Sequence, residues 1–329
     1  MQSIFKGLNP YSSFLYCCLL FWSCTSEPPP LQKIQGYALG TSYSISYVSS
    51  ALTPEYLTQK VDSICEVLNN SLSTYIPDSY ISKINSGDSL LIVDEHFVKV
   101  YQKASEVWEE TDGFFDPTVG TLVNAYGFGP GKPLNYVSKK QRDSMLVLTG
   151  WSKTKLTPQH TIQKKEKAIY FDFNALAKGY TVDVLADYLK SNALESYLVE
   201  IGGEIVAEGK SPRSGKFWKI AIDDPQQRGQ RDFIQTVILE NKALATSGNY
   251  RKYAIDTETG LRIAHSINPK TGEAIPTKVL SASVTAPNCM TADAYATALM
   301  VMPLEDSQKL INSKPELEAY WIVSDSLEG

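Results

Sequence analysis

Residues 168–207, with the sequence AIYFDFNALAKGYTVDVLADYLKSNALESYLVEIGGEIVA, decide the fold. Short apolar runs at both ends are typical of strands, and the longer run between them has the length of a helix. The pair Gly202-Gly203 indicates a turn between the last two runs. The predicted elements are a strand at 168–173, a helix at about 174–190, and strands at 197–201 and 204–207.

The rest of the chain adds helices mainly in its first half and strands in its second. Strands that cluster together with helices outside them indicate an α+β fold with mixed sheets and flanking helices. Because regular βαβ alternation is missing, a doubly wound Rossmann fold is not expected. Further helices are predicted at 54–72, 95–111, 139–146, 291–302 and 304–311, and further strands at 217–222, 233–239 and 279–286.

The N-terminus has the features of an export signal. Lys6 supplies a positive charge, and the apolar run 14–22 is as long as a signal-peptide core but too short to span a bilayer. Ser23 then precedes Cys24, which resembles a bacterial lipoprotein signal whose cysteine is lipidated. Cleavage without lipidation is the alternative interpretation.

This interpretation divides the chain into three parts. We expect a signal peptide at 1–23, a lipidated Cys24 that opens a Pro-rich tether at 24–33, and one functional domain at 34–329. The protein would then be exported and held by its lipid on the periplasmic face of a bacterial membrane.

Composition narrows the remaining classes of function. The chain has 329 residues, 43% of them hydrophobic, which is enough for one large domain or two small ones. The net charge is -5 and no basic run occurs, so nucleic acid is not an expected partner. Beyond the signal, only Cys65 and Cys289 remain. Two distant cysteines make no disulfide framework, and we interpret them as small buried hydrophobic residues.

A glycine- and aromatic-rich stretch is the first candidate for a binding site. It reads GFFDPTVG at 113–120 and NAYGFGP at 124–130. Glycines let backbone approach a ligand, and aromatic faces can flank a flat ring system. The alternative is an aromatic loop packed on the core.

A second candidate lies at the predicted junction of strand and helix, where 172–180 reads DFNALAKGY. Helix N-termini bind anions, and Lys178 in the first turns could reach a phosphate. Alternatively, Asp172 is a helix cap and Lys178 a solvated surface charge.

A third candidate is the helical segment 292–297, ADAYAT, in which Asp293 and Thr297 share one face. Their oxygens are the hard ligands that magnesium prefers, together with phosphate and water. The alternative is a carboxylate hydrogen-bonded to a hydroxyl. His265, beside a predicted turn at 265–269, is a candidate general base, or simply a satisfied polar residue.

Taken together, these motifs resemble the ApbE family of FAD:protein FMN transferases, over residues 39–302. The order of the motifs makes the resemblance specific, and it implies an ApbE-like, T-fold-like architecture. In chain order the motifs are 40–41 (GT), 73–75 (STY), 78–79 (DS), 115–120 (FDPTVG), 127–130 (GFGP), 177–180 (AKGY), 200–204 (EIGGE), 245–250 (ATSGNY), 265–269 (HSINP) and 292–297 (ADAYAT).

The resemblance implies a role for particular residues. The backbone carbonyl of Ala175 and the side chains of Asp293 and Thr297 would hold Mg²⁺. The substrate would be FAD, and its FMN half would pass to a Thr or Ser hydroxyl of an exported acceptor protein, with release of AMP. His265 is our candidate for accepting the hydroxyl proton. The FAD site would be lined by Leu39, Tyr75, Phe114, Phe115, Asp116, Asp172, Lys178 and Ile267.

Two positions depart from the family pattern. Leu39 stands where many relatives carry methionine, and Asn174-Ala175 replaces two glycines. Neither departure touches Lys178 or Asp293, so we expect an active enzyme. Two other functions stay open: a metal-dependent FAD pyrophosphatase that releases FMN and AMP to water, and an FAD-binding lipoprotein without turnover.

Overall fold

The computed structural model describes residues 30–224, 232–249, 253–255, 262–274 and 278–324. Cys24 and the predicted signal peptide lie outside these residues. The first strand, β1 (Leu31–Ala38), begins inside the predicted tether, because Leu31 packs against a small hydrophobic cluster. This strand begins three residues before the predicted boundary at 34.

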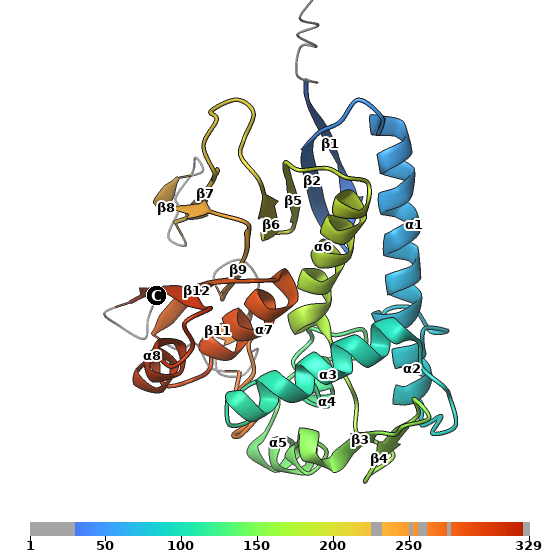
Figure 1. Ribbon diagram of the computed structural model, residues 1–329. Coiled ribbons are helices and arrows are strands. Elements are labelled where there is room, and N and C mark those ends of the chain that lie inside the picture. Colours follow the sequence, from blue (N-terminus) through green and yellow to red (C-terminus); the bar gives the residue numbers. More distant parts are fainter. Residues whose placement is uncertain (1–29, 225–231, 250–252, 256–261, 275–277, 325–329) are drawn as a thin grey trace, which may run out of the picture.

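A seven-stranded sheet forms the centre of the molecule, and all of its neighbouring strands pair antiparallel (Figure 1). This arrangement confirms the α+β class and differs from the parallel sheet of a Rossmann fold. In spatial order the strands are β1, β2 (Thr41–Val48), β5 (Tyr197–Ile201), β6 (Glu204–Glu208), β9 (Lys242–Gly248), β12 (Val279–Ala286) and β13 (Glu318–Val323).

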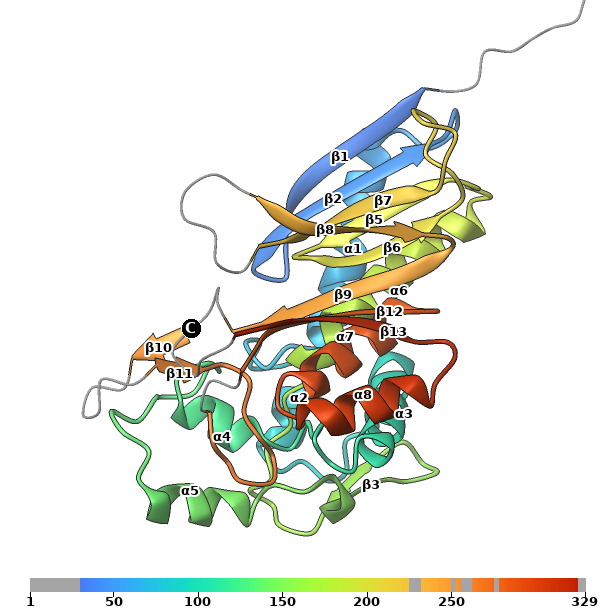
Figure 2. The ribbon, with the colours of Figure 1, turned by 90° about the vertical axis from the view of Figure 1, so that its left-hand side faces the viewer.

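Three short hairpins stand apart from the central sheet. The hairpin β7–β8 packs on β6 and β9 through Trp218 and Leu239. Figure 2 shows this hairpin on one side of the sheet, with α1 and α6 on the other. The hairpins are β3 (Thr154–Leu156) with β4 (Ile162–Lys164), β7 (Trp218–Asp223) with β8 (Phe233–Leu239), and β10 (Tyr253–Ile255) with β11 (Arg262–Ala264).

The helices agree closely with the predicted ones. Thr53, Asp94 and Ser138 cap three of them with side-chain oxygens, which explains where those helices begin. The helices are α1 (Pro54–Leu72), α2 (Tyr80–Asn85), α3 (Glu95–Glu110), α4 (Gly120–Ala125), α5 (Lys139–Leu146), α6 (Asn174–Ser191), α7 (Cys289–Leu299) and α8 (Leu304–Asn312), with a 3₁₀ turn at Trp151–Lys153.

The predicted strand at 168–173 is wrong. Only an isolated parallel bridge between Val119 and Tyr170 occurs there. Ile169, Phe171 and Phe173 are buried, but the side chain of Asn85 provides hydrogen bonds that a neighbouring strand would. Its amide nitrogen donates to the carbonyl of Phe171 at 2.9 Å, and its oxygen accepts from the Phe171 N–H at 2.7 Å.

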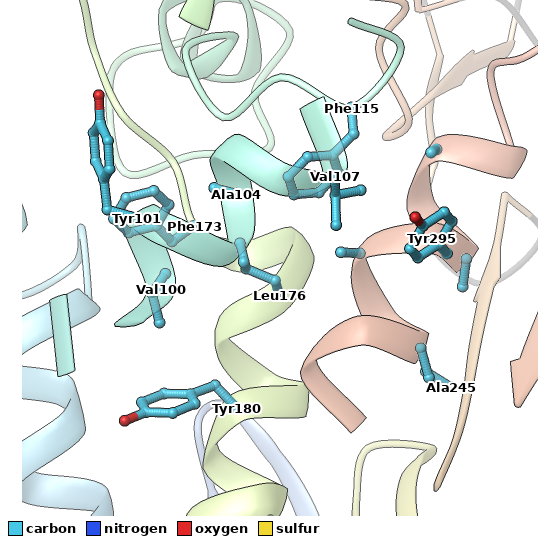
Figure 3. Packing of buried hydrophobic residues seen from close by; sticks show 14 of the residues in the cluster. Val100, Tyr101, Ala104, Val107, Phe115, Phe173, Leu176, Tyr180, Ala245 and Tyr295 are labelled. Atoms are coloured by element: carbon cyan, nitrogen blue, oxygen red, sulfur yellow. The ribbon is translucent and has the colours of Figure 1, made fainter. Parts of the chain in front are cut away.

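The core lies where α3, α6 and α7 meet. Figure 3 shows side chains of all three helices in one cluster, which includes Val100, Ala104, Leu176, Tyr180 and Tyr295. A second cluster packs α1 and α6 against β1, β2 and β5, and both free cysteines are buried in it. In the described part of the chain, every helix is too short or too polar to cross a membrane.

Candidate active site

One cavity of about 1610 Å³ brings together all the described residues to which the sequence assigned a role. Its walls come from the β1–β2 turn, the end of α1, the loop before α4, the start of α6, the β5–β6 turn, β7, β9 and α7. The assigned residues that line it are Leu39, Tyr75, Phe114, Phe115, Asp116, Asp172, Ala175, Lys178, His265, Ile267, Asp293 and Thr297.

The close approach of α6 and α7 depends on Gly179. A Cβ at this position would lie 2.4 Å from the backbone oxygen of Cys289 and 2.9 Å from the Cβ of Asp293. Contacts this short are not tolerated, so only glycine lets the two helices meet here. The Gly179 N–H donates to Asp293 Oδ2 at 3.0 Å across this contact.

This hydrogen bond bears on whether a metal ion could bind, because it places Asp293 relative to the predicted carbonyl ligand of Ala175. The Gly179 N–H is the usual helical partner of the Ala175 carbonyl, four residues earlier. Asp293 Oδ2 therefore lies beside that carbonyl, and the two oxygens belong to the kind that magnesium prefers. Among the described residues, no group of three or more His, Cys, Asp or Glu side chains could hold a metal. The predicted set of one carboxylate, one carbonyl and one hydroxyl stays a prediction.

Thr297 lies one turn after Asp293 but does not bond to it. Within the described residues, its hydroxyl pairs with the Ser247 hydroxyl on β9 at 3.3 Å. The simpler interpretation of a carboxylate and a hydroxyl bonded to each other therefore does not hold. Asp293 and Thr297 both line the cavity.

Lys178 is not a solvated surface charge. It forms an ion pair with Glu204, a residue that is only 3% exposed. Burial lowers the pKa of Lys178, but the carboxylates of Glu204 and Asp293 raise it by more, so the ammonium stays charged. Burial also raises the pKa of Asp293 to about 7, while the nearby Lys178 acts in the opposite direction.

Asp116 holds the glycine- and aromatic-rich loop in place. Its Oδ1 accepts from the N–H of Thr118 at 2.8 Å and from the Thr118 hydroxyl at 2.5 Å. Its Oδ2 accepts from the N–H of Trp151 at 2.9 Å. These bonds use most of the carboxylate for shaping the loop, and they anchor the buried ring of Phe115 beside it.

Aromatic side chains form another part of the wall. Tyr75 is 56% exposed, and its hydroxyl donates to the Phe128 carbonyl at 3.2 Å. The ring of Phe114 lies 4.2 Å from the ammonium of Lys270, a cation–π contact. These rings provide the apolar surfaces that a flat heterocycle needs.

The remaining assigned residues close the cavity at two further places. Asp172 Oδ1 accepts from the Asn174 N–H at 2.8 Å, so this carboxylate also caps the start of α6. His265 directly follows β11 and is half-buried, with its ring 6.2 Å from that of Phe128 in an edge-to-face arrangement. Ile267 is buried against α4.

Many polar residues of the cavity had no role predicted from the sequence, among them Thr41, Glu204 and Ser247. Glu204 could have been found from the sequence, because this carboxylate directly follows the predicted turn Gly202-Gly203. Its partnership with Lys178 joins positions 26 residues apart, which no local pattern shows.

The cavity joins a half-buried lysine on α6, a carboxylate and a hydroxyl on the facing α7, and aromatic side chains. This combination is typical of an α+β protein that binds a phosphorylated aromatic ligand. Comparison with known proteins makes the class definite. The model of the ApbE family matches residues 39–321.

The similarity extends over nearly the whole chain. The FAD:protein FMN transferase of Vibrio cholerae is 36% identical, over 86% of this chain and 85% of that protein. The protein of the same name from Haemophilus influenzae is 35% identical, over 92% and 88%. The solved structure of the flavin transferase ApbE from Vibrio cholerae superimposes with a TM-score of 0.80 at 34% identity, covering 90% of this chain and 95% of that one. The chain therefore belongs to the ApbE family, which confirms the resemblance in its motifs.

Proposed function

We propose that the protein is a magnesium-dependent FAD:protein FMN transferase. It would move the FMN half of FAD to a Thr or Ser hydroxyl of an exported acceptor protein and release AMP. The observation that carries the proposal is that Lys178, Asp293 and Thr297 line one cavity together with aromatic side chains of the loops around it. The names of the relatives supply the reaction class.

The charged part of FAD matches the polar end of the cavity. Lys178 would contact the pyrophosphate, and the start of α6 would add backbone N–H groups and the positive end of its dipole. Tyr75 and Phe114 would flank a ring of the dinucleotide. Leu39, Phe115 and Ile267 would provide apolar contact, and Asp116 would act by holding its loop.

The ligands proposed for the metal are the Ala175 carbonyl, Asp293 and Thr297. Bound there, Mg²⁺ would offset the charge of the pyrophosphate and of the leaving phosphate. The protein's own part is to keep these oxygens in place, which Gly179 and Ser247 do through their contacts with α7.

The proposed transfer is a substitution at phosphorus. The acceptor hydroxyl oxygen forms a bond to the phosphorus of the FMN half. The bond from that phosphorus to the bridging oxygen breaks, and AMP leaves with that oxygen. His265 is the proposed acceptor of the hydroxyl proton.

The size of the cavity favours a second reactant. Small-molecule sites usually have volumes of about 300–1,000 Å³. At about 1610 Å³ the cavity exceeds that range, which leaves room for part of an acceptor segment beside a dinucleotide. We further propose that lipid at Cys24 holds the enzyme at the periplasmic face of the membrane, where exported acceptors are accessible.

Incubation of the purified protein with FAD, Mg²⁺ and a candidate acceptor tests the proposal. The expected result is flavin fluorescence on the acceptor band of a denaturing gel, with AMP in solution and loss of both in EDTA. AMP without a labelled band, for every acceptor tried, would favour the pyrophosphatase. FAD that stays intact while bound would favour a binding protein.

A further inference from the structure

Glu204 is a buried carboxylate with an incomplete set of partners. It opens β6 directly after the Gly202-Gly203 turn and is 3% exposed. Its Oε1 pairs with the Lys178 ammonium, while its Oε2 has no hydrogen-bond partner in the described part of the chain. A buried polar atom without a partner costs about 1–3 kcal/mol, so this arrangement is not the best one for stability alone.

Lys178 has two carboxylates within electrostatic reach and pairs with only one of them. Both Glu204 and Asp293 raise its pKa, which shows that both act on the ammonium. Yet within the described residues the only ion pair of Lys178 is with Glu204. Asp293 instead accepts the Gly179 N–H on Oδ2, and no described group donates to its Oδ1.

We propose that Glu204 is a positioning residue that holds Lys178 away from Asp293 and so keeps the Asp293 carboxylate available for a divalent cation. Without Glu204, Asp293 is the remaining carboxylate that acts on the half-buried ammonium. A Lys178–Asp293 ion pair would occupy the oxygen that the cation needs. The inference rests on the proposed metal site and adds to it a residue that touches neither the cation nor the reacting phosphorus.

A simpler explanation must be separated from this one. Glu204 also lowers the local net charge, and loss of a negative charge weakens cation binding at any distance. That effect adds independently for each substitution. The effect of a Lys178–Asp293 ion pair is not additive, because Lys178 would block cation binding at Asp293 only when Glu204 is absent.

The test is a double-mutant cycle of Glu204→Gln, Lys178→Met and the double variant, in the full-length protein without FAD. The readout is the affinity for Mn²⁺, measured from the paramagnetic signal of the free ion, so no turnover is needed. We expect Glu204→Gln to weaken binding about 10–100-fold, as removal of a supporting partner does. Lys178→Met removes a charge that also acts on Asp293, so it should tighten binding, but by less than Glu204→Gln weakens it. The double variant should bind no more weakly than the wild type, whereas additive effects would leave it weaker.

The control is Glu208→Gln, the same change on the same strand but outside the cavity. It should bind Mn²⁺ like the wild type, and thermal unfolding of every variant shows which of them fold. Additive effects, which leave the double variant binding more weakly than the wild type, would overturn the proposal in favour of simple charge, and so would a Lys178→Met variant that tightens binding as much as Glu204→Gln weakens it. Wild-type affinity in folded Glu204→Gln would overturn it outright. If the wild type binds no Mn²⁺, the metal site itself is wrong, which is a separate result.

Discussion

At the scale of single residues, the use of each carboxylate oxygen separates scaffold from site. Asp116 uses both of its oxygens to hold backbone and hydroxyl donors of its own loop. Asp293 uses one oxygen to bind the Gly179 N–H and has another to spare. Two buried aspartates with similar exposure therefore differ in chemical capacity, because Asp116 uses most of its lone pairs on its own loop and Asp293 does not.

His265 provides a prediction at this scale. Replacing it with alanine should slow FMN transfer by about 10²–10⁴-fold, the usual contribution of a general base, and change FAD affinity much less. Single-turnover rates and FAD titrations measure the two effects separately. His160, which lies outside the cavity, gives the matched control His160→Ala, with wild-type rates expected. A loss confined to FAD affinity would mean that His265 is a binding residue and no base.

The composition of the cavity was largely predictable from the sequence, and the partnerships inside it were not. Phe114, Lys178 and Asp293 stood out because an aromatic–glycine loop, a lysine near a helix start and a carboxylate–hydroxyl spacing each suggest chemistry. The pairing of Lys178 with Glu204 depends on where β6 meets α6, and the pairing of Thr297 with Ser247 depends on where β9 meets α7. Both are set by packing between distant segments.

At the scale of elements, the contact of α6 with α7 is the part of the fold that builds the site. Gly179 is the residue that permits it. In an exposed helix, glycine to alanine stabilises by about 1 kcal/mol, because alanine loses less backbone entropy. Here the added Cβ would clash with the Cys289 carbonyl, so alanine should destabilise the protein instead.

We therefore expect Gly179→Ala to lower the free energy of unfolding by about 1–3 kcal/mol, the usual cost of overpacking, and to impair the metal site as α7 moves. Urea unfolding measures the first effect, and Mn²⁺ affinity the second. Asp187→Ala, an exposed change in the same helix, controls for helix propensity. A Gly179→Ala variant more stable than the wild type would show that the helices do not meet as closely as described.

Asp183 on α6 links the same two helices in a pH-dependent way. It accepts from the N–H of Cys289 at 2.6 Å and of Met290 at 2.8 Å, at the start of α7. Burial raises its pKa from 3.8 to about 6, against the lowering effect of those N–H groups. A raised pKa means that the folded state binds the proton more tightly than the unfolded state does.

The stability that Asp183 costs at neutral pH should therefore be regained as pH falls through about 6 towards 3.8. Compared with Asp183→Asn, which does not titrate, the wild type should gain up to about 3 kcal/mol over this range. Unfolding of both proteins by urea at several pH values measures the difference. A constant difference between pH 7 and pH 4 would contradict the burial of this carboxylate.

Helices were easier to predict than strands. The spacing of Leu57, Val61 and Leu68 located α1. The strands β1 to β4, β9 to β11 and β13 were not predicted. Of these, β2 does show the alternation, in Tyr43, Ile45 and Tyr47, which are buried on one face. The apolar run at 168–173 looks like a strand, but the Asn85 side chain, and no strand, bonds to the backbone of Phe171. Apolar periodicity cannot show where such hydrogen bonds come from.

At the scale of the whole molecule, the proposed lipid at Cys24 would hold the transferase domain at the membrane. Replacing Cys24 with serine should move the protein from the membrane fraction to the soluble fraction and leave the mature domain's FAD affinity unchanged. Fractionation of cells with detection of the protein, and the mass of its N-terminus, measure this. Cys65→Ser is the control, since that cysteine is buried in the domain. An unmodified N-terminus on the wild-type protein would contradict lipidation and would favour a signal peptide that is cleaved without it.

The family comparison and the cavity agree on one central claim, which is that this fold transfers FMN from FAD to a protein. The most direct measurement is the ratio of flavin attached to a purified acceptor to AMP released, for the wild type and for Asp293→Asn. We expect about one flavin attached for each AMP released, and neither product without Mg²⁺. Loss of a residue that only supports a metal site lowers activity about 10–100-fold, and Asp293→Asn should lower the rate by more than that. Release of AMP with no attached flavin, or undiminished transfer by Asp293→Asn, would contradict it.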